Sequence, residues 1–188
     1  MVNLKINGQS VSVPEGTTVL EAAKANGIDI PTLCYLKDVS ETGSCRMCVV
    51  EIVGARALQA ACVYPVAEGI EVLTHSPKVK KARKSTLELI LSDHDKQCLT
   101  CSRNQKCELQ KLTEELGITD IPFEGVMNSY EIDDSSPSIV RDNNKCVLCR
   151  RCVNVCKNVQ TVGVIDAQER GFNTKIGCAF EADLADNA

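Results

Sequence analysis

The sequence predicts an α+β protein made of small units that are built around cysteines. Three observations lead to this fold class. Residues 1–75 alternate strand and helix patterns, the next segment carries two helix signals, and 12 cysteines occur among the 188 residues, most of them in three groups. Because the chain has no tryptophan, three tyrosines and three phenylalanines, its core must consist mainly of Val, Ile, Leu and Ala.

A β-hairpin is expected at the start of the chain. Apolar residues alternate with polar ones on both sides of Asn7-Gly8, namely Leu4 and Ile6 before it and Val11 and Val13 after it. Alternation with a period of two is typical of strands, and Asn-Gly favours the tight turn of a hairpin.

A short helix and further strands are expected next. Thr18, followed three residues later by Glu21, is typical of a capping box at a helix start, and Gly27 is expected to end that helix. Runs rich in β-branched residues at 49–53 and 70–73 predict the remaining strands of this small α+β domain.

The middle of the chain predicts two helices. Ser76-Pro77 supplies an N-cap and a first-turn proline for a helix that reaches Leu91, and a second helix is expected from Glu108 to Leu116. The segment 118–139 contains prolines, serines and aspartates without periodicity, so we expect a connector there.

The charge balance excludes several classes of partner. There are 21 Lys and Arg against 25 Asp and Glu, a net charge of −4, which gives no general reason to bind nucleic acid or an acidic membrane surface. We see no apolar run long enough for an integral membrane segment and no signal peptide pattern, so we expect a cytoplasmic protein with protein partners. In that compartment cysteines stay reduced, which favours metal ligation over disulfides.

The first group of cysteines has the spacing C-x10-C-x2-C-x13-C and consists of Cys34, Cys45, Cys48 and Cys62. A [2Fe–2S] cluster needs thiolates for both of its irons, and a CxxC pair with two remote cysteines supplies them. The first gap is longer than in plant-type ferredoxins, so the match is to a variant. A four-cysteine zinc site is the alternative, although such sites usually have two CxxC pairs.

The second group has the spacing H-x3-C-x2-C-x5-C and consists of His94, Cys98, Cys101 and Cys107. One imidazole and three thiolates suit either zinc or a [4Fe–4S] cluster. In a cluster, a neutral imidazole in place of a thiolate removes one negative charge and is expected to raise the potential.

The third group has the spacing C-x2-C-x2-C-x3-C and consists of Cys146, Cys149, Cys152 and Cys156. This is the bacterial ferredoxin run, in which three thiolates bind one [4Fe–4S] cluster and the fourth normally binds a second one. Only the isolated Cys178 follows. We therefore expect either a chain that is a fragment, or one cluster that takes Cys156 or Cys178 as its fourth ligand.

Four segments carry a resemblance to a known family: 30–35 (IPTLCY), 45–51 (CRMCVVE), 89–94 (LILSDH) and 145–152 (KCVLCRRC). Together with the order of the three groups, they resemble the N-terminal iron–sulfur region of cytosolic, NAD-dependent, electron-bifurcating iron-only hydrogenases. The large iron–sulfur subunit of respiratory complex I is similar as well. The resemblance covers essentially the whole chain and implies that the chain is truncated before a catalytic part.

The resemblance also implies a domain order. It predicts a β-grasp [2Fe–2S] ferredoxin-like domain at 1–75, a small helical domain with a His-ligated [4Fe–4S] cluster at 76–117, a connector at 118–139, and an incomplete two-cubane ferredoxin-like domain at 140–188. Iron is then the metal in all three groups, and the residues given include no catalytic residue.

By the same resemblance, we expect an oxidoreductase subunit that relays single electrons between a hydrogen-activating site and a flavin/NAD(H) module. The implied partners are a flavin- and NAD-binding diaphorase subunit, a small [2Fe–2S] subunit and soluble ferredoxin, with no flavin or NAD on this chain. The alternatives are the equivalent subunit of a complex I-like NADH dehydrogenase or an NAD-dependent formate dehydrogenase, and, from another class, a zinc-stabilised interaction protein.

Overall fold

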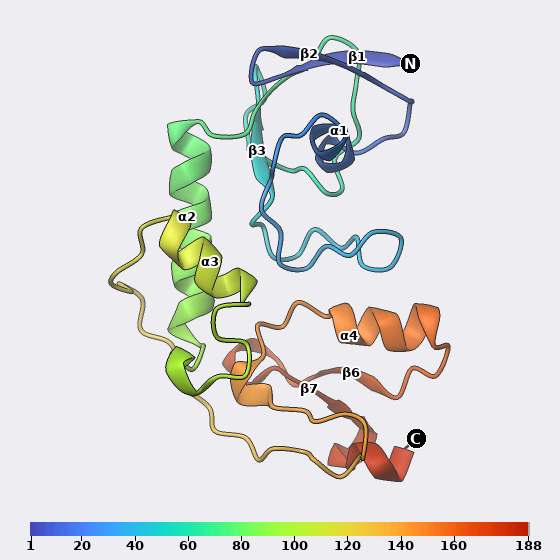
Figure 1. Ribbon diagram of the computed structural model, residues 1–188, viewed down its shortest axis with the longest axis vertical. Helices are drawn as coiled ribbons and strands as arrows, with labels where there is room; N and C mark the ends of the chain where they lie inside the picture. The colour runs from blue at the N-terminus through green and yellow to red at the C-terminus, as the bar shows by residue number, and fades with distance from the viewer. Residues whose placement is uncertain (188) are drawn as a thin grey trace.

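The computed structural model describes residues 1–187 and begins with a five-stranded mixed sheet (Figure 1). The strands lie in the order β2-β1-β5-β3-β4, with β1 and β5 parallel and the other neighbours antiparallel. Their bounds are β1 Val2–Ile6, β2 Gln9–Val13, β3 Val49–Ile52, β4 Gln59–Ala60 and β5 Glu71–Leu73. The hairpin and the two later strands agree with the sequence analysis, whereas β4 was not expected.

Local signals start and end the first helix as expected. Helix α1 (Val19–Ala25) has Thr18 as its N-cap, and the Thr18 hydroxyl accepts a hydrogen bond from the Glu21 amide. Gly27 follows with a φ of +71°, a conformation that glycine adopts at little cost. The apolar face of α1 packs with the inward side chains of the sheet into one buried core.

Two further helices form the middle of the molecule. Helix α2 (Pro77–Ser92) is capped by Ser76, whose hydroxyl accepts from the Val79 amide, and α3 is Glu108–Glu115. Figure 1 shows α2 running beside β3 at one end and toward the C-terminal unit at the other. Both helices lie within a residue or two of their predicted bounds.

The C-terminal unit contains a helical segment and a hairpin. Helix α4 (Arg151–Asn154) continues into the wider π-helical turn η3 (Val155–Val159), and β6 (Ile165–Gln168) pairs antiparallel with β7 (Lys175–Cys178). The remaining elements are short 3-10 turns: η1 Cys98–Thr100, η2 Asn143–Lys145, η4 Gly171–Asn173, η5 Ala179–Glu181 and η6 Leu184–Asn187. The β6–β7 hairpin was missed because each strand has only 4 residues, too few for an alternating pattern to stand out.

A second apolar core joins the three parts of the chain. Its buried members are Leu33, Met47, Leu87, Leu91, Leu109 and Leu112, which come from the first cysteine loop, α2 and α3. Cys45, Cys107 and Val147, one from each part, pack against it. Polar contacts add to this packing, since Asn154 Nδ2 donates to Ser40 Oγ at 2.9 Å and Lys145 pairs with Asp95.

Within residues 1–187, no helix combines the length and the apolar character needed to cross a membrane.

Candidate metal centres

The first group of cysteines lies in the sheet domain, where Cys45 packs against the second apolar core. Cys34, Cys48 and Cys62 are buried, with at most 1% of their surface exposed, and Cys45 is partly buried. They come from two places: Cys34, Cys45 and Cys48 lie in the long connection between α1 and β3, and Cys62 lies in the turn after β4. The fold therefore brings together four thiols that are up to 28 residues apart in sequence (62 − 34 = 28).

These four thiols form two pairs. The Sγ atoms of Cys48 and Cys62 lie 3.3 Å apart and share a hydrogen bond, which lowers the pKa of Cys48 to about 7 and raises that of Cys62. In the other pair, a hydrogen bond from the Cys45 thiol lowers the pKa of Cys34 to about 4, against the effect of burial. Four thiols in two neighbouring pairs suit a centre that shares its thiolates between two metal atoms.

Hydroxyl groups reinforce the negative charge at Cys34. The side chains of Ser44 and Thr42 both donate to it, and their hydrogen bonds lower its pKa further. Between them, Gly43 is buried at a φ of +62°, and a Cβ there would lie 3.1 Å from a methyl group of Val63. The tight loop therefore places small donors around the sulfur, as a sulfide-containing cluster requires.

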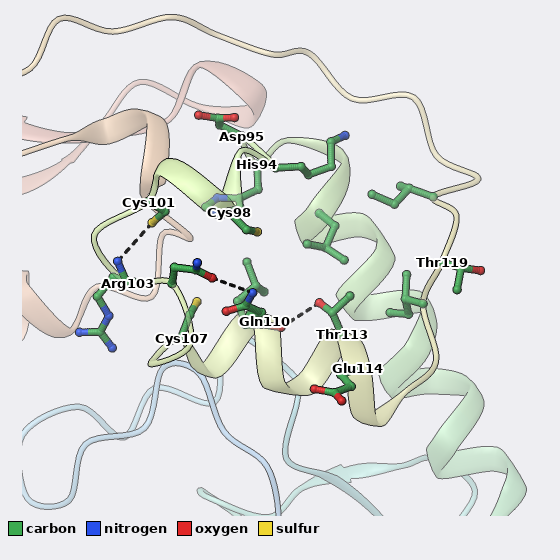
Figure 2. Close-up of a pocket in the computed structure, with 16 residues that line it drawn as sticks. His94, Asp95, Cys98, Cys101, Arg103, Cys107, Gln110, Thr113, Glu114 and Thr119 are labelled. Carbon is green, nitrogen blue, oxygen red and sulfur yellow. Dashed lines mark hydrogen bonds between the residues drawn. The ribbon is translucent and has the colours of Figure 1, made fainter.

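The second group borders a hollow of about 480 Å³. Figure 2 shows His94, Cys98, Cys101 and Cys107 around it, with Gln110 of α3 at one side. The Nδ1 atom of His94 is buried and, within residues 1–187, has no hydrogen-bond partner. Burial, and then the charge of Lys145, lower the pKa of His94, which favours the neutral imidazole that binds metals.

The hollow has room for a multi-atom group. A zinc ion would draw its sulfur ligands to about 2.3 Å from one atom. Within residues 1–187, no three His, Cys, Asp or Glu side chains are close enough together to hold a single metal ion. The four candidate ligands instead line part of a hollow of about 480 Å³, which has room for a group larger than one metal ion.

The third group lies on a loop and on the helical segment of the C-terminal unit. Cys146 and Cys149 lie in the loop before α4, Cys152 lies in α4, and Cys156 lies in the π-helical turn. Burial raises the pKa of the Cys146 thiol, so a thiolate there calls for a cation. Cys178 is fully buried at the end of β7, where it pairs with a residue of β6.

Backbone N–H groups point at the sulfur atoms in two of the groups. The Arg103 amide donates to Cys101 Sγ at 3.4 Å, and the Leu148 amide donates to Cys146 Sγ at 3.3 Å. The cysteine loops adopt left-handed conformations at five non-glycine residues, Asp38, Arg46, Gln105, Leu148 and Arg150. Such strain persists at functional sites, and N–H bonds to sulfur tune the potential of a cluster.

Sequence reasoning missed two residues near the first group. Thr42 donates to Cys34, and the guanidinium of Arg83 donates to the Val49 carbonyl next to Cys48. A signal for Arg83 was present in the sequence, because it occupies the position between Val79 and Leu87 on the four-residue repeat that forms the apolar side of α2.

Three protein families match successive parts of the chain. Residues 1–77 match a "2Fe-2S iron-sulfur cluster binding domain", residues 83–122 an "NADH-ubiquinone oxidoreductase-G iron-sulfur binding region", and residues 136–188 an "NADH-quinone oxidoreductase subunit 3, ferredoxin-like domain". The expectation of both [2Fe–2S] and [4Fe–4S] cofactors is thereby confirmed, as is the mixed α and β composition with ferredoxin-like domains.

Two curated relatives align with nearly the whole chain. NADP-reducing hydrogenase subunit HndD of Solidesulfovibrio fructosivorans is 47% identical over 191 residues, covering 99% of this chain and 33% of the relative. The NADH-ubiquinone oxidoreductase 75 kDa subunit of Reclinomonas americana is 34% identical over 191 residues, covering 100% of this chain and 28% of the relative. The chain thus spans a third or less of the length of these relatives.

One solved structure is similar in fold and in sequence. A chain in the crystal structure of NAD⁺-reducing [NiFe]-hydrogenase in the H2-reduced state has a TM-score of 0.91 and 31% identity, covering 100% of this chain and 79% of that one. The predicted resemblance to hydrogenase and complex I subunits is confirmed. The chain belongs to the family of iron–sulfur subunits shared by NAD(P)-linked hydrogenases and NADH-quinone oxidoreductases, and it corresponds to the N-terminal region of HndD and of the 75 kDa subunit.

Proposed function

We propose that this chain is an electron relay in an NAD(P)-linked hydrogenase, carrying single electrons between a hydrogen-activating site and a flavin/NAD(H) module. The observation that carries the proposal is the apolar core shared by all three ligand groups. Cys45 and Cys107 pack against it together with Val147, the neighbour of Cys146. The clusters of an electron relay have to be held at fixed, short separations. A common core of buried leucines provides the rigid packing that fixes them.

We assign the first centre as a [2Fe–2S] cluster. The two thiol pairs, Cys34 with Cys45 and Cys48 with Cys62, support this, and these four residues would hold the cluster. The strand order with α1 packed on the sheet suits the β-grasp domain expected at 1–75. The chain's own contribution is to exclude water from the sulfurs and to donate hydrogen bonds to them.

We assign the second and third centres as [4Fe–4S] clusters. His94, Cys98, Cys101 and Cys107 hold one in the domain 76–117. In the domain 140–188, Cys146, Cys149 and Cys152 hold another, and Cys156 serves a second cubane. When bound, such clusters supply one-electron redox chemistry. Two observations support these assignments. The second group converges on one hollow, and Cys156 lies in a π-helical turn, a feature that is frequent at functional sites.

The finer assignment to an electron-bifurcating hydrogenase rests on the identity with a relative named as an NADP-reducing hydrogenase subunit. It brings with it the proposed partners, a flavin/NAD-binding diaphorase subunit, a small [2Fe–2S] subunit and soluble ferredoxin. A cytoplasmic location belongs to the same proposal, since all 12 cysteines are free thiols.

A second candidate is the equivalent relay of a complex I-like NADH dehydrogenase. It is favoured by the two family matches with NADH-quinone oxidoreductase subunits over residues 83–122 and 136–188. Purification of the chain with its native partners discriminates between the two. H2-dependent reduction of NAD(P)⁺ supports the hydrogenase, and NADH-dependent quinone reduction without hydrogen activity supports the complex I-like enzyme.

The first test of the relay is cluster analysis of the anaerobically purified chain. Iron, acid-labile sulfide and zinc are quantified, and the dithionite-reduced protein is examined by EPR. We expect one [2Fe–2S] signal and at least one [4Fe–4S] signal. A colourless protein loaded with zinc would support the interaction-protein alternative, because Zn²⁺ has no redox chemistry.

A further inference from the structure

Within residues 1–187, Arg83 is a buried cation without an ion-pair partner. It lies on the side of α2 that faces β3, and only 4% of its surface is exposed. Its Nη2 donates to the Val49 carbonyl at 2.8 Å, while its Nε is buried with no hydrogen-bond partner within residues 1–187. No carboxylate in that part of the chain forms an ion pair with it.

Such a group requires a counter-charge. A charged side chain in an apolar interior is costly unless a partner of opposite sign is close. Burial lowers the pKa of Arg83 to about 10, and the negative charges of the Cys48 thiolate and then of Asp29 oppose this effect. The side chain is therefore still a cation at neutral pH, and the larger of the two negative influences on it comes from the first cysteine group.

The hydrogen bond from Arg83 to the Val49 carbonyl also points to the first cysteine group. Val49 follows Cys48 directly in the chain, so the guanidinium lies against the backbone that presents one of the buried sulfurs. Arg83 belongs to α2, which follows the sheet domain, and so the charge reaches back across the boundary between the two units. Lys80 and Lys84 on the same helix are exposed, where water and salt screen them.

We propose that Arg83 is the buried counter-charge of the cluster held by Cys34, Cys45, Cys48 and Cys62, and that it raises the midpoint potential of that cluster. The inference rests on the [2Fe–2S] assignment proposed above. A [2Fe–2S] cluster with four thiolates is anionic, and the single electron that reduces it adds a further negative charge. A nearby, unscreened cation stabilises the reduced form more than the oxidised form.

The test is a redox titration with dithionite, followed by EPR of the [2Fe–2S] signal, on the full chain and on two variants. Arg83→Gln keeps an N–H donor for the Val49 carbonyl and removes the charge, whereas Arg83→Lys keeps the charge. We expect Arg83→Gln to shift the midpoint to lower potential and Arg83→Lys to shift it much less. Lys84→Gln, the exposed control one residue away, should leave the midpoint unchanged.

Several outcomes would overturn the proposal. One is an unchanged midpoint potential in Arg83→Gln. Another is a shift in Arg83→Lys as large as that in Arg83→Gln, because this would show that the shape of the side chain matters and its charge does not. If Arg83→Gln does not retain iron, the comparison moves to cluster content: retention in Arg83→Lys supports the counter-charge, and loss in both variants contradicts it. Absence of a [2Fe–2S] signal in the unaltered chain would instead refute the assignment of the centre itself.

Discussion

At the scale of single residues, the chemistry of the site depends on groups that lack ordinary partners. Within residues 1–187, His94 has a buried, unpaired ring nitrogen, and Arg83 has a buried, unpaired Nε. Buried polar atoms in native proteins are nearly always hydrogen-bonded, so each exception calls for an explanation. Both atoms belong to side chains beside a cysteine group, and the clusters proposed there would account for both; the other two such nitrogens in the described part of the chain are the Nε atoms of Arg141 and Arg151.

Replacing His94 by cysteine is expected to keep the second cluster and lower its potential. A fourth thiolate adds one negative charge to the centre, and the added charge disfavours reduction. Potentiometric EPR of the His94→Cys variant measures this, with the [2Fe–2S] midpoint in the same sample as an internal control. An unchanged midpoint would contradict a ligand role for His94.

At the scale of elements, one close backbone contact fixes the end of α2 next to the His94 site. A Cβ at Gly125 would lie 2.2 Å from the carbonyl oxygen of Ser92, the last residue of α2. The connector therefore passes against the helix end at a position where only glycine fits. The segment expected as a plain linker has a structural role beside the second centre.

Gly125→Ala is expected to destabilise the chain by about 1–3 kcal/mol, as overpacking does. Because the collision involves backbone atoms, the connector or the helix end has to move, and the EPR spectrum of the His-ligated cluster should change. Val126→Ala is the control, since Val126 is adjacent and half exposed. Thermal unfolding and EPR of both variants provide the comparison, and equal effects at both positions would argue against the contact.

At the scale of the whole molecule, the shared apolar core makes the three ligand groups one body. Leu87 of α2 is fully buried among residues from the first cysteine loop and α3, whereas Leu89, two positions away, has 54% of its surface exposed. The core and not the sequence neighbourhood therefore sets how the centres lie relative to one another. The proposed relay depends on that arrangement.

Leu87→Ala is expected to lower the free energy of unfolding by about 2–5 kcal/mol, the usual range for such a truncation in a core. It should also weaken magnetic interaction between the reduced clusters, because the packing that holds them loosens. Leu89→Ala should change unfolding by less than about 0.5 kcal/mol, as exposed substitutions do. Denaturant unfolding and low-temperature EPR measure both effects, and similar losses in the two variants would count against the shared core.

The sequence by itself determined the local features of this protein. The ligand spacings, the Thr18 and Ser76 caps and the Asn7-Gly8 turn involve residues a few positions apart, so their identity follows from nearby chemistry. The same holds for the two helices of the middle unit. The domain bounds and the individual ligand assignments stay predictions, to be tested by the cluster analysis.

Only the tertiary structure decided which distant residues meet. It pairs β1 with β5, packs Met47 with Leu87 and Leu112, and turns Arg83 back toward Val49. It also forms the β6–β7 hairpin and the contact of Gly125 with Ser92. Contacts between remote segments follow from how whole surfaces pack, and the periodicity of a single segment carries too little information to specify its partner.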